Sequence, residues 1–335
     1  MDRRSFVHRT AGGLAALGAL RALSACRPEA PSAAEDAEFV ALRERYFLAT
    51  LELNPVTSTY LGGDGYSPTL AAVNGKLRDF SPAALGGEVT FLQSVLTALA
   101  AMPVGTLSPQ ARIDHAVVTA QAGYMVHQLA DLRYHERCVD TYVAEPFRGI
   151  DWQIQGMTDA GSGLLGTEQE WALVVARAGA VPAYVETARA NLLAGKAAGN
   201  IPDRRLVARD GIAGARANVE YFTTTLPGLA TQYIGGRPFG PALIDQLKTA
   251  GAAAGAAYAA MGEFLGATYD SKETTDRYAA GEVEYAWRVT NCLRDPRTPA
   301  ELFEVLESCV VPGGAPTFHR GLTALMEVVS APTRS

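Results

Sequence analysis

Side chains that commonly bind metal ions recur at four-residue intervals near the middle of the chain, as His127, Asp131 and His135. On an α-helix this spacing puts all three on one face, where two neighbours can chelate one ion. The outer two lie too far apart along the helix axis to share that ion, and no Glu or third His at ligand spacing completes a site. We therefore predict no metal centre from these candidate ligands, and a solvated or hydrogen-bonded helix face is the simpler interpretation.

Residue types used by hydrolases also occur, but in unsuitable arrangements. Asp114 directly precedes His115, and adjacent residues on a helix do not face each other. Ser162 has no strand before it, so it does not form a nucleophile elbow. Glu282 and Glu284 are two positions apart and point away from each other on a helix, which makes them poor partners in acid–base catalysis. The sequence therefore predicts no catalytic residue.

Three glycines, Gly161, Gly163 and Gly166, match the spacing of a dinucleotide-binding loop. That fingerprint requires a buried strand before the first glycine and a helix that opens within it, so that backbone amides meet a pyrophosphate. The preceding residues, DWQIQGMTDA, are polar and do not alternate. The glycines instead predict a flexible loop before a helix that begins at Thr167.

Aromatic and charged side chains cluster after the histidines, in a stretch that we expect to be irregular and to join two long helices. Exposed aromatic residues on such segments often border clefts. The candidate cleft-lining residues are Tyr142, Phe147, Arg148, Asp151 and Trp152. In the alternative interpretation, Phe147 and Trp152 fill the interior of a helical bundle.

The elements that must position these residues are predicted to be helices. Proline stands at an expected first helical position four times, usually behind a capping residue: Ser81-Pro82, Ser108-Pro109, Gly240-Pro241 and Thr298-Pro299. Long apolar-periodic segments cover residues 108–134, 171–193, 203–222 and 242–265. The pattern predicts an all-α fold, a bundle of long helices joined by proline-rich elbows with no substantial sheet. Small residues in 250–260 permit a close helix–helix approach.

The first 26 residues predict export and lipidation. Arg3, Arg4 and Phe6 belong to a twin-arginine pattern that precedes an apolar stretch, and Leu23-Ser24-Ala25-Cys26 matches a lipobox in which Cys26 carries the lipid. We expect a membrane-anchored lipoprotein that faces the periplasm or cell exterior, with residues 27–37 as its tether. Ordinary cleavage near Ala25, which would leave a soluble exported protein, is the alternative.

The net charge and the cysteine spacing exclude some classes of partner and of metal site. A net charge of −6 over 335 residues gives no electrostatic reason to expect nucleic acid. Beside Cys26, the chain contains Cys138, Cys292 and Cys309. Their spacing matches no metal motif, so we interpret them as small buried thiols, with a Cys292–Cys309 disulfide as the alternative.

Three stretches carry a family resemblance. LELNPVTSTYLGGDGYS, PAYVETARANLLAGKAAGNIPDRRLV and YAAGEVEYAWRVTNCLRDPRTPAELFEVL resemble the bacterial domain-of-unknown-function 885 family. The resemblance covers roughly residues 39–306 and implies an exported, helical, zinc-metallopeptidase-like protein whose amino-terminal half frames a peptide cleft. It also implies an active site built on a later helix from a His-Glu pair and a Gly-His-His sequence.

The chain departs from the family at that active site. It contains no H-E-x-x-H and no Gly-His-His, and His135-Glu136 lacks a second histidine one turn further on. We therefore divide the chain into a helical domain at 38–311, corresponding to the amino-terminal part of the family domain, and an atypical tail at 312–335. The predicted function is the catalytically silent scaffold half of a peptidase-like lipoprotein, with zinc expected only if a missing carboxy-terminal part is supplied. The alternative is a non-catalytic lipoprotein that binds a peptide or small molecule.

Overall fold

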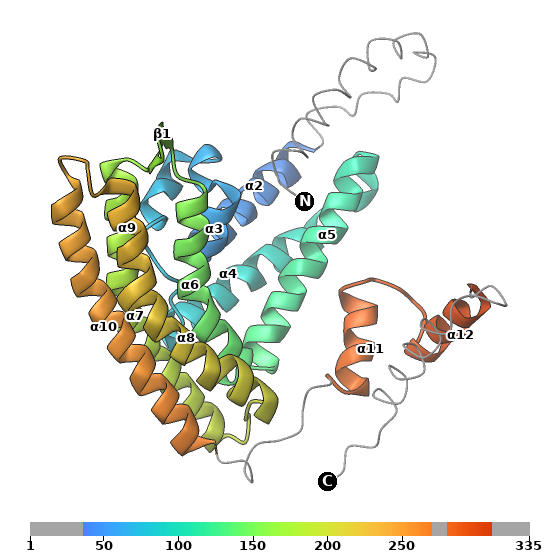
Figure 1. The fold of residues 1–335 in the computed structure, drawn as a ribbon. Coiled ribbons are helices and arrows are strands. Elements are labelled where there is room, and N and C mark those ends of the chain that lie inside the picture. The colour runs from blue at the N-terminus through green and yellow to red at the C-terminus, as the bar shows by residue number, and fades with distance from the viewer. Residues whose placement is uncertain (1–35, 270–279, 310–335) are drawn as a thin grey trace.

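A computed structural model describes residues 36–269 and 280–309 of the protein. The predictions for Arg3, Arg4, Phe6 and Cys26, most of the tether and the 312–335 tail lie outside these residues. Helices form nearly all of the described chain (Figure 1). The α-helices are α2 Ala37–Leu53, α3 Pro55–Leu61, α4 Pro82–Ala101, α5 Pro109–Val126, α6 Val139–Gln155, α7 Glu168–Ala197, α8 Gly214–Glu220, α9 Leu226–Ile234, α10 Gly240–Thr268, α11 Glu282–Asn291 and α12 Pro299–Cys309. The all-α prediction is confirmed.

Capping residues and prolines set several helix starts, as the sequence predicted. The Ser81 and Ser108 hydroxyls accept the backbone N–H three residues further on, at the starts of α4 and α5. Thr167 and Glu170 form a reciprocal capping box at the start of α7. The Asp36 carboxylate, just before α2, accepts the backbone N–H of Ser108 at 3.0 Å and its hydroxyl at 2.5 Å. This contact fixes the entry of the chain beside the start of α5.

The predicted irregular stretch after His135 is wrong, because residues 139–155 form the continuous helix α6. This helix contains Pro146, whose ring removes one backbone hydrogen bond from a helix interior. The helix persists because one face, including Val139, Val143 and Ile150, is buried against its neighbours. Tertiary packing thus outweighs the local cost of a proline inside a helix.

The predicted loop at the three glycines is a small hairpin of β1 Asp159–Gly161 and β2 Leu164–Leu165. Gly161, Gly163 and Gly166 have φ angles of +80°, +80° and +84°, a backbone region that glycine enters at little cost. The glycines therefore shape a turn ahead of α7, which begins where the sequence predicted.

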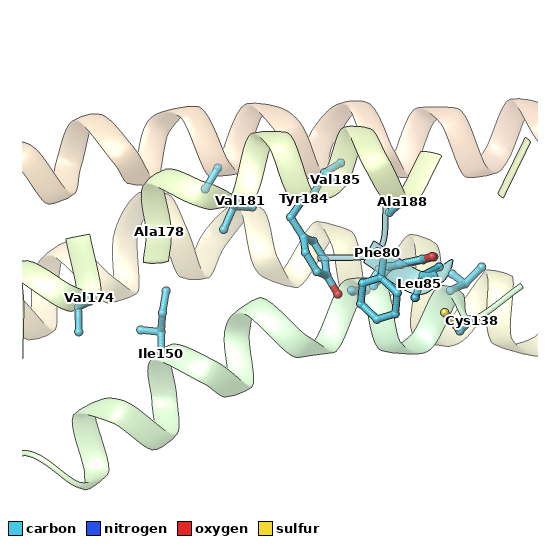
Figure 2. Packing of buried hydrophobic residues seen from close by; sticks show 14 of the residues in the cluster. Phe80, Leu85, Cys138, Ile150, Val174, Ala178, Val181, Tyr184, Val185 and Ala188 are labelled. Atoms are coloured by element: carbon cyan, nitrogen blue, oxygen red, sulfur yellow. The ribbon is translucent and has the colours of Figure 1, made fainter. Parts of the chain in front are cut away.

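Helix α7 lies at the centre of the core and packs along both α10 and α6 (Figures 1 and 2). Its side chains Val174, Ala178 and Val181 are fully buried, and Figure 2 shows Ile150 of α6 on the same apolar seam. A Cβ built on Gly251 of α10 would lie 2.2 Å from the Phe222 carbonyl oxygen. The close helix–helix approach predicted for residues 250–260 is therefore present.

One arginine links three elements inside the bundle. Arg177 of α7 is fully buried, and its guanidinium donates to the Lys76 carbonyl at 2.9 Å and the Gly149 carbonyl at 2.7 Å. It also donates to the Gln153 side chain and the Thr59 hydroxyl. Burial lowers the pKa of Arg177 to about 10, and Glu145 opposes this shift. The hydrogen bonds compensate the desolvation of the charge and join α3, α6 and α7.

Helix α4 is long and apolar enough to cross a membrane by length and composition alone. Its buried positions, including Leu92, Val95 and Leu99, belong to the main core. Its outward positions include the polar residues Gln93, Ser94 and Thr97. In this structure α4 is therefore one member of the bundle, packed beside α5.

Three helical segments are widened to π geometry, at His127–Asp131, Leu206–Ala213 and Tyr221–Thr225. The first segment continues α5 to Asp131. The sequence predicted that this helix would reach Tyr134, so it ends three residues earlier than expected. The other two interrupt the helical run that contains α8 and α9. Such segments are uncommon and frequently lie at functional sites.

Candidate functional site

A cavity of about 810 Å³ lies along α6, and we call it the α6 cavity. Its walls come from α3, α6, α8 and the turn before α4, together with the segment around His135. This volume is within the range of roughly 300–1,000 Å³ that small-molecule sites usually occupy. The cavity is therefore the candidate site in the described chain.

All three π-helical segments contribute to its wall. Gln128 and Leu129 come from the first, Leu206, Arg209 and Asp210 from the second, and Tyr221 from the third. A π turn inserts an extra residue and so redirects the side chains that follow. The three irregularities thus converge on one place, although they span nearly a hundred residues of sequence.

Three of the five predicted cleft-lining residues line the cavity, namely Phe147, Arg148 and Trp152. Tyr142 and Asp151 do not. Tyr142 is buried in the core, where its hydroxyl donates to the His135 carbonyl at 2.5 Å. Asp151 accepts a hydrogen bond from Gln155 at 2.7 Å. The helical geometry of α6 explains this division, because it separates the five residues onto different faces.

Aromatic rings form part of the cavity wall. Trp152 lies against Tyr60 with ring centroids 4.5 Å apart, and Phe147 makes an edge contact with Tyr221 at 4.7 Å. These contacts hold the rings in place while part of their surface lines the cavity. Phe147, Trp152 and Tyr221 therefore offer an apolar surface for a ligand side chain.

Charged groups lie on the wall near the middle of α6. Arg78, which is 9% exposed, donates through Nη2 to Glu88 Oε2 at 2.7 Å and through Nη1 to Asn54. Glu145 accepts the hydroxyl of Tyr184 at 3.1 Å. Burial raises the pKa of Glu145, and the opposite charge of Arg78 only partly offsets this. The cavity thus contains a fixed cation beside a carboxyl group that protonates more easily than usual.

Three lining residues each contain a buried polar atom without a hydrogen-bond partner in the described chain: Arg78 Nε, His135 Nδ1 and Tyr221 Oη. Burial lowers the pKa of His135, so its ring is held neutral more strongly than usual. Cys138 also lines the cavity, but burial raises the pKa of its thiol, which disfavours the nucleophilic thiolate. The arrangement suits binding more than nucleophilic catalysis.

His127 and Asp131 lie outside the cavity lining, in a separate cluster with α11. His127 Nδ1 lies 2.8 Å from Asp131 Oδ2, and Nε2 lies 2.8 Å from Glu284 Oε2. The ring stacks on Trp287 with centroids 3.8 Å apart. The sequence did not predict the role of Glu284, because 157 residues separate it from His127.

The zinc ion implied by the family resemblance requires ligands directed at one position, and the residues that the structure describes do not provide them. Both ring nitrogens of His127 contact carboxylates, so neither is directed at a metal position. His135 lies in the α6 cavity, away from this pair. Within residues 36–269 and 280–309, no group of three His, Cys, Asp or Glu side chains has an arrangement that could hold a metal ion. These residues do not fit a zinc site.

Comparisons with known proteins give a family and a fold. The family model described as "Bacterial protein of unknown function (DUF885)" matches residues 55–310. A solved structure of a candidate lipoprotein of unknown function from Shewanella oneidensis is similar to this chain, with a TM-score of 0.60 and 17% sequence identity. The match covers 79% of this chain and 44% of that one, so the chain spans less than half of its structural relative. No curated protein matches the chain.

Proposed function

The chain belongs to the DUF885 family of bacterial proteins, and we propose that it is the helical scaffold half of an exported, peptidase-like lipoprotein whose α6 cavity binds peptides or small molecules without cleaving them. The family resemblance supports the peptide-directed part of this proposal. The shape and lining of the cavity support the binding part.

The observation that carries the proposal is the convergence of three π-helical segments on the α6 cavity. Each π turn costs stability relative to a regular α-helix, and such turns persist in proteins mostly where function requires them. Here they place Gln128, Arg209 and Tyr221 on the wall of one cavity. Aromatic rings and several polar groups complete a lining of the kind that binds small ligands.

The requirements of zinc-dependent hydrolysis support the proposal that the α6 cavity is not catalytic. A catalytic zinc is held by about three protein ligands, and a carboxylate base lies beside the bound water. The described residues bring no such set together. The buried thiol of Cys138 supplies no alternative nucleophile, because its pKa is raised.

The amino-terminal sequence supports export and anchoring. Arg3, Arg4 and Phe6 form the twin-arginine pattern, and Cys26 ends the lipobox. We propose that the lipid on Cys26 holds the protein at the membrane, facing the periplasm or the cell exterior. A soluble helical domain would then present its cavity close to the lipid surface.

Peptide-induced thermal stabilisation tests the function. Ligands that bind only the native state raise the melting temperature, so tripeptides that occupy the cavity should stabilise the purified protein, by an amount that grows with the logarithm of the peptide concentration divided by its Kd. Trp152→Ala should weaken this binding about fivefold or more, because it removes an aromatic contact surface. Mass spectrometry of the same peptides after prolonged incubation should find them intact.

A matched aromatic control is Tyr66→Ala. Tyr66 is 58% exposed, contacts Phe47 and does not line the cavity, so its loss should leave peptide binding unchanged. If no tripeptide stabilises the protein, or if both variants weaken binding equally, the α6 cavity is not the binding site. Peptide cleavage that disappears with Trp152→Ala would contradict catalytic silence.

A further inference from the structure

An apolar stripe runs along the outer side of α5. Ile113, Ala116, Val117, Ala120 and Tyr124 recur at three- and four-residue intervals, so they share one face of the helix. Ile113 is 60% exposed and Val117 is 47% exposed. Large apolar side chains that adjoin on one surface differ from scattered single ones, because a contiguous patch commonly marks a place where another element binds.

Helix α11 covers the carboxy-terminal part of this stripe. The Arg288 guanidinium lies over the Tyr124 ring at 5.4 Å, and Trp287 stacks on the ring of His127, one turn further along. Figure 1 shows α11 beside α5. The stripe continues past the end of α11 toward the start of α5, where Ile113 and Val117 are exposed.

A groove of about 540 Å³ lies at this place, and we call it the α5 groove. Ile113 and Val117 form part of one wall, and Cys292 and Leu293, just after α11, form part of the other. Leu293 is 72% exposed. The α5 groove is therefore continuous with the contact between α5 and α11, and it has apolar side chains on both walls.

The carboxy-terminal tail has a sequence pattern that matches such a groove. Residues 310–335 follow α12 and lie outside the described chain. Five apolar residues of the tail recur at the spacing of one helical face: Phe318, Leu322, Leu325, Met326 and Val329. Polar residues fall on the other side of the same helical projection: Arg320, Thr323 and Glu327. The pattern predicts an amphipathic helix of about three turns.

The connection is long enough to bring this segment to the groove. Helices α11 and α12 contact each other, and each is about 15 Å long. Residues 310–317 can span up to about 30 Å, and their glycines and prolines favour turns over a continued helix. A short connection of this kind keeps the attached segment at an effective concentration in the millimolar range, so that even a weak contact forms.

We propose that residues 318–329 dock in the α5 groove as an amphipathic helix, with Leu322 and Leu325 against Ile113 and Val117. An amphipathic helix laid in an apolar groove is a common mode of recognition. The docking segment lies outside residues 55–310, which the family model matches. The α5 groove shares no lining residue with the α6 cavity, so this inference is independent of the proposed function.

The test changes the tail of the full-length chain and measures the groove. Leu325→Lys puts a charge on the apolar face, where burial is costly, whereas Ala324→Lys puts the same charge on the opposite face. We expect Leu325→Lys to speed maleimide labelling of Cys292 and hydrogen exchange of residues 112–121 about fivefold, because both are covered only while the tail is docked. Ala324→Lys should leave both rates unchanged.

A change on the groove side gives a second, independent measurement. Ile113→Lys, at an exposed position, should raise both rates as Leu325→Lys does, and the double variant should show no further increase, since both remove one contact. Circular dichroism shows that each variant is folded. If Leu325→Lys matches the unsubstituted protein, or if Ala324→Lys has an equal effect, the tail does not dock there. Rates that depend on protein concentration would instead identify a second copy of the chain as the occupant and overturn the proposal.

Discussion

Two glycines of α7 differ in the space around them. Comparing them distinguishes the effect of close packing on stability from the effect of glycine's backbone flexibility. A Cβ added to Gly195 would lie 2.3 Å from the Glu136 carbonyl oxygen, whereas a Cβ on Gly179 would meet nothing within 4 Å. The absence of a side chain at Gly195 therefore lets the segment around Glu136, which leads into α6, approach α7. Gly179 has no such requirement.

We predict that Gly195→Ala destabilises the protein by about 1–3 kcal/mol, because backbone atoms must move apart. Gly179→Ala should stabilise it by roughly 0.5–1 kcal/mol, because alanine lowers the entropy cost of an exposed helical position. Urea unfolding of both variants measures the two effects. If both substitutions destabilise the protein equally, the close contact at Gly195 does not explain the cost of adding a side chain there.

At the scale of single residues, the sequence predicted which neighbouring side chains share a helical face better than it predicted their contacts with distant segments. It placed His127, Asp131 and His135 on one helical face. His127 and Asp131 do contact each other at 2.8 Å, but the prediction is wrong for His135, which lies beyond the end of that helix in a separate turn. It could not find Glu284, since a contact between residues 157 positions apart depends on how α11 docks. It also could not separate Tyr142 from Trp152, because burial within α6 follows from neighbours distant in sequence.

At the scale of elements, α11 is held mainly by polar contacts. Val289 is its only buried side chain, while Val283 is 86% exposed. Glu284 contacts both His127 and Arg288, and Trp287 stacks on the His127 ring. Such an attachment depends on the protonation states of the groups that make it.

Docking of α11 should therefore weaken as the pH rises. Partial burial lowers the pKa of His127, but the hydrogen bonds with Glu284 and Asp131 outweigh it and raise the pKa above its ordinary value. A raised pKa means that the contribution is complete below about pH 6.5, the ordinary value for histidine, and is lost as the pH rises through the folded-state pKa. Hydrogen exchange of residues 282–291, corrected for intrinsic rates, should show faster opening at alkaline pH.

Two glutamate variants show whether the His127–Glu284 contact causes this pH response. Glu284→Gln should remove most of the pH response of α11, whereas Glu282→Gln, at an exposed position two residues away, should retain it. An identical pH response in both variants would rule out the His127–Glu284 contact as its cause. Below the lowered pKa of Glu284 the docking should weaken again, as that carboxylate takes up a proton.

Helix starts were the most predictable feature of the elements, and helix continuity was the least. Pro82, Pro109 and Pro299 each follow a Ser or Thr, and each stands at the first position of its helix, because capping is a local interaction. The stretch that contains Pro146 was predicted to be irregular and is helical, since the packing of α6 outweighs the local cost of that proline. The three π-helical segments leave no comparable local signal in the sequence.

At the scale of the whole molecule, the all-α fold was predictable and the α6 cavity was not. Helical periodicity and proline placement occur in every segment, so each supports the same fold class. The cavity draws residues from around positions 54, 78, 125–152 and 206–221, which meet only when the bundle assembles. The division into leader, tether, helical domain and tail stays a prediction.

Lipidation is testable on the full-length protein in cells. Cys26→Ser should move the protein from the membrane fraction to the soluble exported fraction, because apolar burial of acyl chains supplies the anchoring energy. Cys292→Ser is the matched control, since that partly buried cysteine lies outside the lipobox. Equal membrane retention of both variants would mean that something other than a lipid on Cys26 anchors the protein.

The bond between Asp36 and Ser108 sets a limit on where an anchored domain can go. Cys26 and Asp36 are ten positions apart, and an extended chain covers at most about 3.6 Å per residue. With Cys26 in the bilayer, the amino-terminal end of α5 stays within about 36 Å of the lipid headgroups, whatever the orientation of the rest. An anchored protein would then meet its ligands in the solution close to the membrane surface.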